Sequence, residues 1–179
     1  MKLFICSDIH GSLTQAQKAV EIYKESQADY FICLGDLYYH GPRNKLPEGY
    51  APRDVANLLN TIKERVIAIK GNCDAEVDQM ISEFPIHESM IMMDEKGHRF
   101  FFHHGHHEVI FPTSYDVIFS GHTHIAVLEK KEDGVIYANP GSVSLPKAEK
   151  SQGYFIVENG KITHYDINTR EIMHSIVIE

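Results

Sequence analysis

The sequence has few cysteines, no excess of positive charge and no long apolar run. Its three cysteines, Cys6, Cys33 and Cys73, are odd in number and widely spaced, which argues against a disulfide scaffold and for a reducing compartment. No apolar stretch approaches the roughly 18 residues that a membrane span requires. The apolar stretch at 3–6 is too short for the core of a signal peptide. We therefore expect a cytoplasmic protein with no membrane partner.

Acidic residues outnumber basic ones by 25 to 17, which gives a formal net charge of −8 with histidine neutral. A net negative surface does not attract polyanions, so binding to long nucleic acid is disfavoured. A small anionic substrate is still compatible with this charge, because a metal centre supplies local positive charge. Hydrophobic residues make up 43% of the chain, as in ordinary globular proteins. The 179 residues suffice for a single domain, 1–179, with a buried core.

The N-terminal half alternates apolar runs with amphipathic segments. The spacing of Ser12 and Gln15 is that of a capping box and predicts a helix over about 13–27. A second amphipathic helix is predicted after Pro52. This alternation indicates a parallel sheet with helices on its faces, in which ligands bind at the C-terminal ends of the strands. Three short apolar runs predict the strands, and each ends in a polar loop: 3–6, 30–34 and 66–69.

The C-terminal half has the pattern of a β-rich region. Residues 86–93 and 98–103 predict two strands joined across a turn. Asp133-Gly134 and Asn159-Gly160 are tight-turn signals between alternating apolar runs. The last predicted strands are 154–157, 162–167 and 172–178.

One long irregular loop is predicted at 38–51. Loops of this length in a compact domain are usually functional or mobile. Two roles are compatible with its residues: contact with substrate through Tyr38, Tyr39 and Arg43, or a structural or oligomer contact.

Groups able to bind a divalent metal follow five of the predicted strands. Because successive side chains of a strand point to opposite sides, Asp8 and His10 can point the same way, as can His122 and His124. The adjacent glycines allow close backbone approach or unusual dihedral angles. Each motif is weak alone, but the ordered set is hard to obtain by chance: Asp8-x-His10, Gly35-Asp36, Gly71-Asn72, His104-Gly105-His106 and Gly121-His122-Thr123-His124.

The donor types of these motifs indicate the class of metal. Carboxylate, amide and imidazole together suit Mn²⁺, Fe, Zn²⁺, Co²⁺ or Ni²⁺ and differ from the all-oxygen set of Ca²⁺. Two such ions about 3.5–4 Å apart can clamp a phosphate and activate water. One carboxylate must then bridge them, and Asp36, alone in its loop, is the natural candidate. The set therefore predicts a metal-dependent phosphoesterase.

These five motifs resemble the signature motifs of the calcineurin-like metallophosphoesterase superfamily. Segments 40–52, 71–74 and 139–147 narrow the resemblance to the small bacterial phosphodiesterases of the YfcE type. The resemblance implies an α/β fold of two mixed β-sheets packed as a sandwich and flanked by helices, with Mn²⁺ as a frequent metal. It also implies the ligands: Asp8, His10 and His124 for a first ion, Asn72, His104 and His122 for a second, and Asp36 as the bridge.

One position departs from the wider superfamily. There the residue after Asn72 is usually a histidine that stabilises the transition state or protonates the leaving group, whereas this chain and the YfcE-like group have a cysteine, Cys73. A neutral thiol replaces imidazolium poorly, so we expect activated aryl phosphodiesters to react better than alkyl esters. Cys73 is expected to face the site without binding metal. His106 is expected to orient a ligand or touch phosphate, which completes a catalytic set with Asp36, Asn72 and Cys73.

Two functions of different class are compatible with the sequence. The first is a hydrolase of a small phosphate ester, preferably a phosphodiester, with a phosphomonoester as the alternative substrate. The second is a protein-interaction scaffold, because the Vps29 subunit of retromer has a similar fold, a degraded metal site and no histidine at the position of Cys73. The intact ligand positions favour the hydrolase. The family resemblance also suggests a dimer or tetramer.

Overall fold

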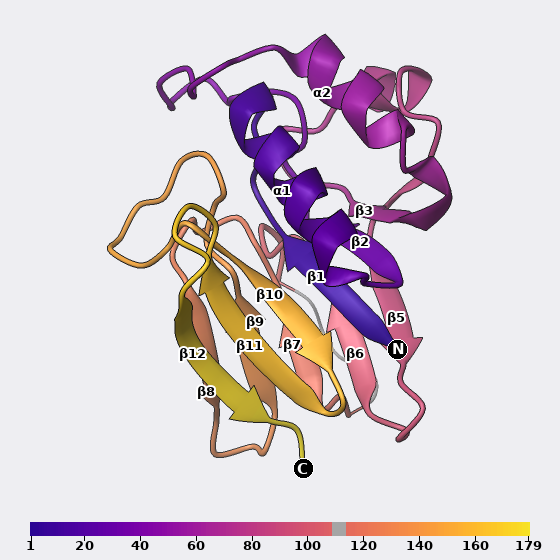
Figure 1. Cartoon of the computed structure of the whole chain (residues 1–179), viewed down its shortest axis with the longest axis vertical. Coiled ribbons are helices and arrows are strands. Elements are labelled where there is room, and N and C mark those ends of the chain that lie inside the picture. The colour runs from indigo at the N-terminus through magenta and orange to yellow at the C-terminus, as the bar shows by residue number, and fades with distance from the viewer. Residues whose placement is uncertain (109–113) are drawn as a thin grey trace.

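The computed structural model describes residues 1–108 and 114–179, which form two β-sheets with helices on one outer side (Figure 1). The larger sheet has the spatial order β12 (Ile172–Val177), β11 (Lys161–Asp166), β10 (Gly153–Glu158), β1 (Lys2–Cys6), β2 (Tyr30–Cys33), β3 (Val66–Ile69) and β4 (Ile86–His87). The smaller has the order β5 (Met90–Met93), β6 (Arg99–Phe102), β7 (Val117–Phe119), β9 (Ile136–Asn139) and β8 (Val127–Lys130). Both are mixed, since β1 to β4 and the group β6, β7 and β9 are parallel while the outer strands pair antiparallel. The predicted fold class is confirmed.

Local sequence signals account for the helices. The hydroxyl of Ser12 accepts a hydrogen bond from the backbone N–H of Gln15 at the start of α1 (Leu13–Ser26), whereas the Gln15 side-chain oxygen has no partner among the described residues, so the capping box is half formed. Helix α2 (Pro52–Asn60) begins with Pro52, whose fixed φ suits a first helical position. Two short 3₁₀ turns, η1 (Lys63–Arg65) and η2 (Glu76–Met80), follow.

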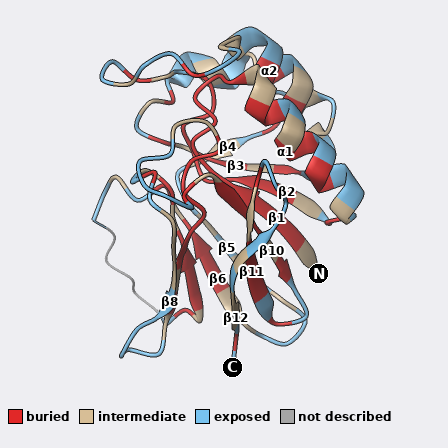
Figure 2. Ribbon diagram, turned by 60° about the vertical axis from the view of Figure 1, so that its left-hand side comes forward, coloured by how far each residue is buried: buried red, intermediate tan, exposed pale blue. Residues whose placement is uncertain are grey.

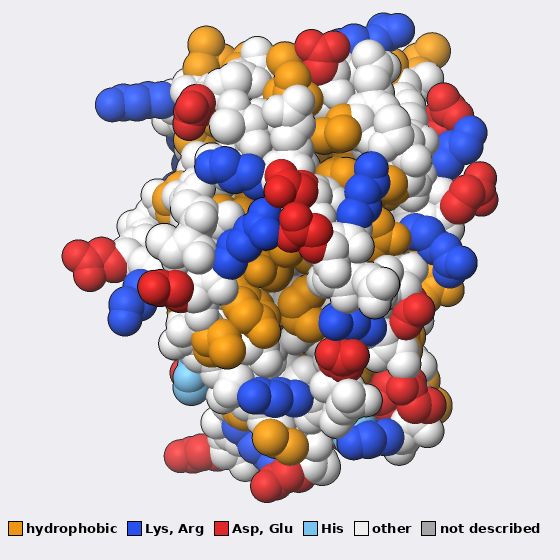
Figure 3. Space-filling model, in the orientation of Figure 1, with side chains coloured by type: hydrophobic (Ala, Val, Ile, Leu, Met, Phe, Trp, Pro, Cys, Tyr) orange, Lys and Arg blue, Asp and Glu red, His pale blue; other side chains and the backbone are white. Residues whose placement is uncertain are grey.

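The buried residues lie mainly on the strands, while the helices expose one side (Figure 2). Acidic and basic side chains are interspersed over the face seen in Figure 3. None of the helices in the described part of the chain is both long and apolar enough to cross a membrane.

Each strand of the larger sheet contributes to two cores, because successive side chains point to opposite faces. Leu3 and Ile5 of β1 pack against Phe100, Phe102 and Phe119 of the smaller sheet. The rings of Phe102 and Phe119 stack with centroids 5.0 Å apart. Burying each such side chain contributes about 1.5–3 kcal/mol to the free energy of folding. This inner core holds the two sheets face to face.

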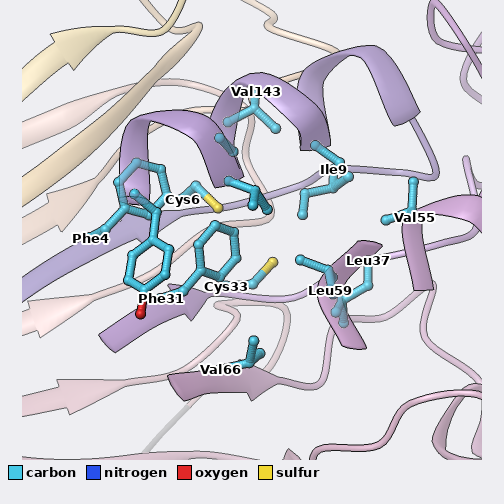
Figure 4. Close-up of a cluster of buried hydrophobic side chains, with 14 of the residues drawn as sticks. Phe4, Cys6, Ile9, Phe31, Cys33, Leu37, Val55, Leu59, Val66 and Val143 are labelled. Atoms are coloured by element: carbon cyan, nitrogen blue, oxygen red, sulfur yellow. The ribbon is translucent and has the colours of Figure 1, made fainter. Parts of the chain in front are cut away.

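The opposite face of the larger sheet packs against both helices. Phe4 and Cys6 of β1, with Phe31 and Cys33 of β2, point into this second core (Figure 4). Helices α1 and α2 contribute to the same cluster. The sheet therefore has helices on one face and the second sheet on the other, rather than helices on both.

One detail of the C-terminal half differs from the prediction. The predicted strand 86–93 is two strands, of which β4 pairs with β3 and β5 pairs with β6 of the other sheet. A continuous apolar run does not reveal that its halves pair with different partners. The turns at Asp133-Gly134 and Asn159-Gly160 are confirmed, since each lies between two strands that pair antiparallel.

Candidate metal centre

All seven predicted ligand residues lie in loops that follow the C-terminal ends of strands. Neighbouring parallel strands bring these loops together at one end of the sandwich. Strands of both the larger and the smaller sheet carry candidate ligands at their C-terminal ends. Asp8 and His10 follow β1, Asp36 follows β2, Asn72 follows β3, His104 follows β6, and His122 and His124 follow β7.

The backbone at five of these residues is left-handed, with φ values of 57° at Asp8, 50° at His10, 55° at Asp36, 66° at His122 and 59° at His124. Such values are uncommon for residues other than glycine and concentrate at functional sites. The alternation argument used for Asp8 and His10, and for His122 and His124, is therefore wrong, because all four lie beyond their strands. The loop after β1 is instead bonded to the neighbouring one: the N–H groups of Asp8 and His10 donate to the carbonyls of Gly35 and Asp36 at 3.0 and 2.8 Å.

Four of the residues form a first group around Asp8. Its Oδ1 atom lies 3.1 Å from Nε2 of His124 and 3.6 Å from Nε2 of His10. The ligand atoms of Asp8, His10, Asp36 and His124 all lie within 4.8 Å of one another, and all four residues are buried. Oδ1 of Asp8 has no hydrogen-bond partner among the described residues. A buried carboxylate oxygen without a partner, facing imidazole nitrogens, fits a divalent cation.

A second group adjoins the first at Asp36. Oδ2 of Asp36 lies 3.6 Å from Nε2 of His10 and 3.5 Å from Nε2 of His104. Nε2 of His104 also lies 3.2 Å from the Oδ1 atom of Asn72. The ring of His122 lies beside that of His104, with centroids 5.2 Å apart. Asp36 thus lies between the two groups, where a bridging carboxylate would have to be.

Backbone carbonyls fix the orientation of three of the imidazoles. Each ring can donate its Nδ1–H to a carbonyl oxygen, which leaves Nε2 free as an electron-pair donor. This arrangement is typical of metal-binding histidines. The acceptors are Tyr39 for His10 at 2.7 Å, Leu34 for His104 at 2.7 Å and Leu145 for His124 at 2.6 Å.

The charges of these groups are coupled. Burial alone would raise the pKa of Asp8, but the imidazoles of His10 and His124 hold it well below its usual range. For His104, burial lowers the pKa and Asp36 raises it, with a net result of about 9. In the absence of metal, protons on the imidazoles therefore compensate the buried carboxylates. A metal must displace such a proton to bind.

The sequence did not single out Asp74 for a role, although its side chain organises the site. Its carboxylate accepts backbone N–H bonds from Gly71 at 2.7 Å and from Asp36 and Leu37 at 2.8 Å. It thus ties the loop after β2 to the loop after β3. Its position in the Gly71–Asp74 motif was the available signal, but a buried hydrogen-bonding role cannot be read from one sequence.

A cavity of about 730 Å³ opens beside the ligand groups and is lined by Cys73, by residues 41–44 and by Lys147. Burial and the carboxylate of Asp36 raise the pKa of the Cys73 thiol to about 12. His106 is not among the lining residues; its ring packs 5.3 Å from that of His104 and 6.1 Å from that of His122. That His106 orients a ligand or touches phosphate stays a prediction.

Comparison with known proteins identifies the family. Residues 1–161 match the model of the calcineurin-like phosphoesterase superfamily domain. The chain belongs to this superfamily. It is 40% identical to phosphodiesterase YfcE of Escherichia coli K12, over 99% of this chain and 98% of that protein. It is also 30% identical to phosphodiesterase MJ0936 of Methanocaldococcus jannaschii, over 79% of this chain and 83% of that protein.

Solved structures show the same relationship. The E. coli YfcE structure, described as that of a phosphoesterase, superposes with a TM-score of 0.94 over 100% of both chains at 40% identity. The chain is therefore an enzyme of the calcineurin-like phosphoesterase superfamily, as the sequence resemblance implies. A zinc complex of Vps29 from Entamoeba histolytica shares the fold at 16% identity, with a TM-score of 0.64 over 100% of both chains. At that identity the likeness concerns the fold alone.

Proposed function

We propose that the protein is a metal-dependent phosphodiesterase that hydrolyses a small phosphate ester. The observation that carries this proposal is the convergence of the Nε2 atoms of His10, His104 and His124 around the carboxylates of Asp8 and Asp36. The names of the relatives at 40% and 30% identity support the diester as the substrate class.

The ligand assignment follows the two groups described above. Asp8, His10 and His124 would hold one divalent ion, Asn72, His104 and His122 a second, and Asp36 would bridge. Two bound ions would supply Lewis-acid activation of a water molecule and of the phosphate. Imidazole, amide and carboxylate donors suit Mn²⁺, Fe, Zn²⁺, Co²⁺ or Ni²⁺ without choosing among them. Mn²⁺ comes first because the family resemblance implies it. A cytoplasmic location fits the unpaired cysteines.

The chain's own residues determine which leaving groups can depart. His10, His104 and His124 are held in position by backbone carbonyls, so their rings need little reorganisation to act. Cys73 faces the cavity, but a thiol with a pKa of about 12 is a poor proton donor at neutral pH. The leaving group must therefore depart largely as an anion. Aryl oxides meet this requirement and alkoxides do not.

The scaffold hypothesis is the weaker alternative. The similarity to Vps29 concerns the fold only. A scaffold has no need of two buried carboxylates, Asp8 and Asp36, whose oxygens face imidazole nitrogens, because removing such charges from water destabilises a fold.

The test is turnover by metal-stripped protein, with and without Mn²⁺, on an aryl phosphodiester and the matching aryl phosphomonoester. We expect metal-dependent cleavage of the diester, lost in Asp36→Asn. The matched control is Asp78→Asn, which removes a carboxylate that accepts one N–H bond from Ala75 outside the ligand groups. Inactivity on both esters with Mn²⁺, Zn²⁺, Fe²⁺ and Co²⁺ would refute the proposed hydrolysis and favour the scaffold.

A further inference from the structure

The cavity beside the ligand groups contains positive charge that the proposed hydrolysis does not use. Among the described residues, its lining includes two cationic side chains, Arg43 and Lys147. They come from two separate loops, one after β2 and one after β9. Neither forms an ion pair with any residue in 1–108 or 114–179.

The loop that bears Lys147 is fixed to the ligand groups. The backbone N–H of Lys147 donates to the carbonyl of His124 at 3.0 Å. The carbonyl of Leu145 accepts the Nδ1–H of His124 at 2.6 Å. Lys147 and His122, a ligand of the proposed second metal, line the same cavity. Lys147 therefore borders the proposed second metal position.

The turn that bears Arg43 is also held over the site. The Asn44 side-chain amide donates to the carbonyl of His40 at 2.8 Å, and the Asn44 backbone N–H donates to that of Gly41 at 3.4 Å. A Cβ atom on Gly41 would lie 3.1 Å from the sulfur of Cys73. The turn thus lies directly beside Cys73 and presents Arg43 to the cavity.

The carboxylates that line the cavity do not neutralise these cations. Asp74 uses both oxygens to accept three backbone N–H bonds. Asp36 accepts the N–H of Cys73 at 2.8 Å with one oxygen and places the other between His10 and His104. A phosphodiester carries one negative charge, which the metal centre would bind. The cationic side chains of Arg43 and Lys147 then remain available to bind a second anionic group.

We propose that Arg43 and Lys147 form a subsite for a second anionic group on one ester arm of the substrate. The substrate class is then a small phosphodiester with an additional carboxylate or phosphate, which rests on the function proposed above for the scissile bond. The planar guanidinium of Arg43 can bind such a group through two parallel hydrogen bonds, and Lys147 adds a point charge.

The experiment compares two matched diesters, 4-nitrophenyl propyl phosphate and 4-nitrophenyl 2-carboxyethyl phosphate. Both arms contain three carbon atoms, and the carboxyethyl arm ends in a carboxylate where the propyl arm ends in a methyl group. We expect kcat/KM to favour the carboxyethyl ester by about 20-fold, with the preference decreasing as salt is added. Arg43→Gln and Lys147→Gln should each reduce that ratio about 5-fold, as expected for a partly exposed ion pair. Lys45→Gln, in the same loop but outside the cavity lining, should leave the ratio unchanged.

Two outcomes would overturn the subsite. An equal loss on both esters would show that the cations act on the scissile phosphate, and an unchanged ratio would show that they are surface charges. If neither diester is cleaved, the proposed hydrolysis fails, and binding still decides the subsite. For this we would titrate Mn²⁺-loaded protein with phosphonates in which a methylene replaces the aryl ester oxygen. Tighter binding of the carboxyethyl form, lost in both variants, supports the subsite; equal binding of both forms refutes it.

Discussion

At the residue scale, the site consists of carboxylate and imidazole side chains that are buried and lie mainly against one another. Asp8, Asp36, His10, His104 and His124 each expose 2% or less of their surface. Buried charges of this kind destabilise a fold unless they are paired or bind a cation. The residues that hold them in place therefore matter as much as the ligands.

Asp74 is the clearest such residue. Asp74→Asn keeps the shape of the side chain but replaces one of the oxygens that accept three backbone N–H bonds. We expect the free energy of unfolding to fall by about 1–3 kcal/mol and kcat/KM to fall by at least tenfold, because Asp36 is displaced. Asp78→Asn affects a single N–H bond, so both the free energy of unfolding and kcat/KM should fall less in this variant. Urea unfolding and steady-state kinetics measure the two effects, and equal losses in both variants would contradict a positioning role.

His164 should make stability depend on pH. Burial is the main cause that lowers its pKa from 6.5 to about 4. The unfolded chain therefore binds a proton between these values that the folded chain does not, so the stabilisation is complete above about pH 6.5 and is lost as the pH falls toward 4. From pH 7 to pH 5 the loss is about 2 kcal/mol.

The test for His164 is the difference in unfolding free energy between pH 7 and pH 5. His164→Leu should reduce that difference. His174→Leu, at the paired but exposed position on β12, should reduce it much less, because the charge of His174 is a smaller cause of the lowered pKa than burial. An unchanged pH dependence in His164→Leu would show that this side chain does not cause it.

Cys73 should limit the range of leaving groups. Cys73→His places an imidazole on the wall of the cavity and should speed hydrolysis of alkyl diesters relative to aryl diesters. General acid catalysis of this kind typically contributes about 10²–10⁴-fold. The measurement is kcat/KM across diesters whose leaving groups differ in pKa. No gain on any ester would contradict the assignment of a missing proton donor.

At the element scale, the loops after β2 and β3 approach each other so closely that a side chain cannot fit. A Cβ atom on Gly71 would lie 2.1 Å from Oδ1 of Asp36 and 2.4 Å from its backbone nitrogen. The glycine is thus required by packing between two loops rather than by the conformation of a turn. The β8–β9 turn offers the contrast, because Gly134 has a φ of 82° and no atom within 4 Å of its Cβ position.

These two glycines should respond differently to alanine. Gly71→Ala should separate the two loops, destabilise the protein by about 3 kcal/mol or more and abolish turnover. Gly134→Ala should lower stability by only about 1–2 kcal/mol through its left-handed conformation and retain turnover. Thermal unfolding and the diester assay on both variants provide the comparison. Full activity in Gly71→Ala would show that the loops can separate without harm.

At the scale of the whole molecule, the candidate ligands come from both sheets. Asp8, His10, Asp36 and Asn72 follow strands of the larger sheet, and the three other histidines follow strands of the smaller one. Bound ions would therefore link the sheets at one end of the sandwich, beyond the inner core. That residues 1–179 form one domain and that chains assemble as a dimer or tetramer stay predictions, which sedimentation velocity and limited proteolysis would test.

Metal binding should stabilise the entire fold, because the unfolded chain has no assembled site. A free ion concentration of about 100 times Kd adds about 2.7 kcal/mol for each ion. We expect chelation to lower the unfolding temperature and Mn²⁺ to restore it. In Asp36→Asn most of this shift should disappear, whereas Asp78→Asn should retain it. An unfolding temperature that does not respond to any divalent ion would argue against a metal centre.

The sequence by itself determined the elements and the set of candidate ligands. Short apolar runs that end in polar motifs are local features, so β1 to β3, both helices and the five metal-binding motifs could be predicted from residues near one another in the chain. The choice of seven ligands within these motifs came from the family resemblance. The division of the apolar run at 86–93 into two strands could not be predicted, because its two halves pair with strands of different sheets.

Only the tertiary structure decided how the candidates meet. The N–H bonds from Asp36 and Leu37 to Asp74 join loops far apart in the sequence. Arg43 and Lys147, from loops that are also far apart, line one cavity. Such contacts depend on which strands lie side by side. A local pattern fixes which residues follow a strand, but the distances between loops arise from the packing of the two sheets.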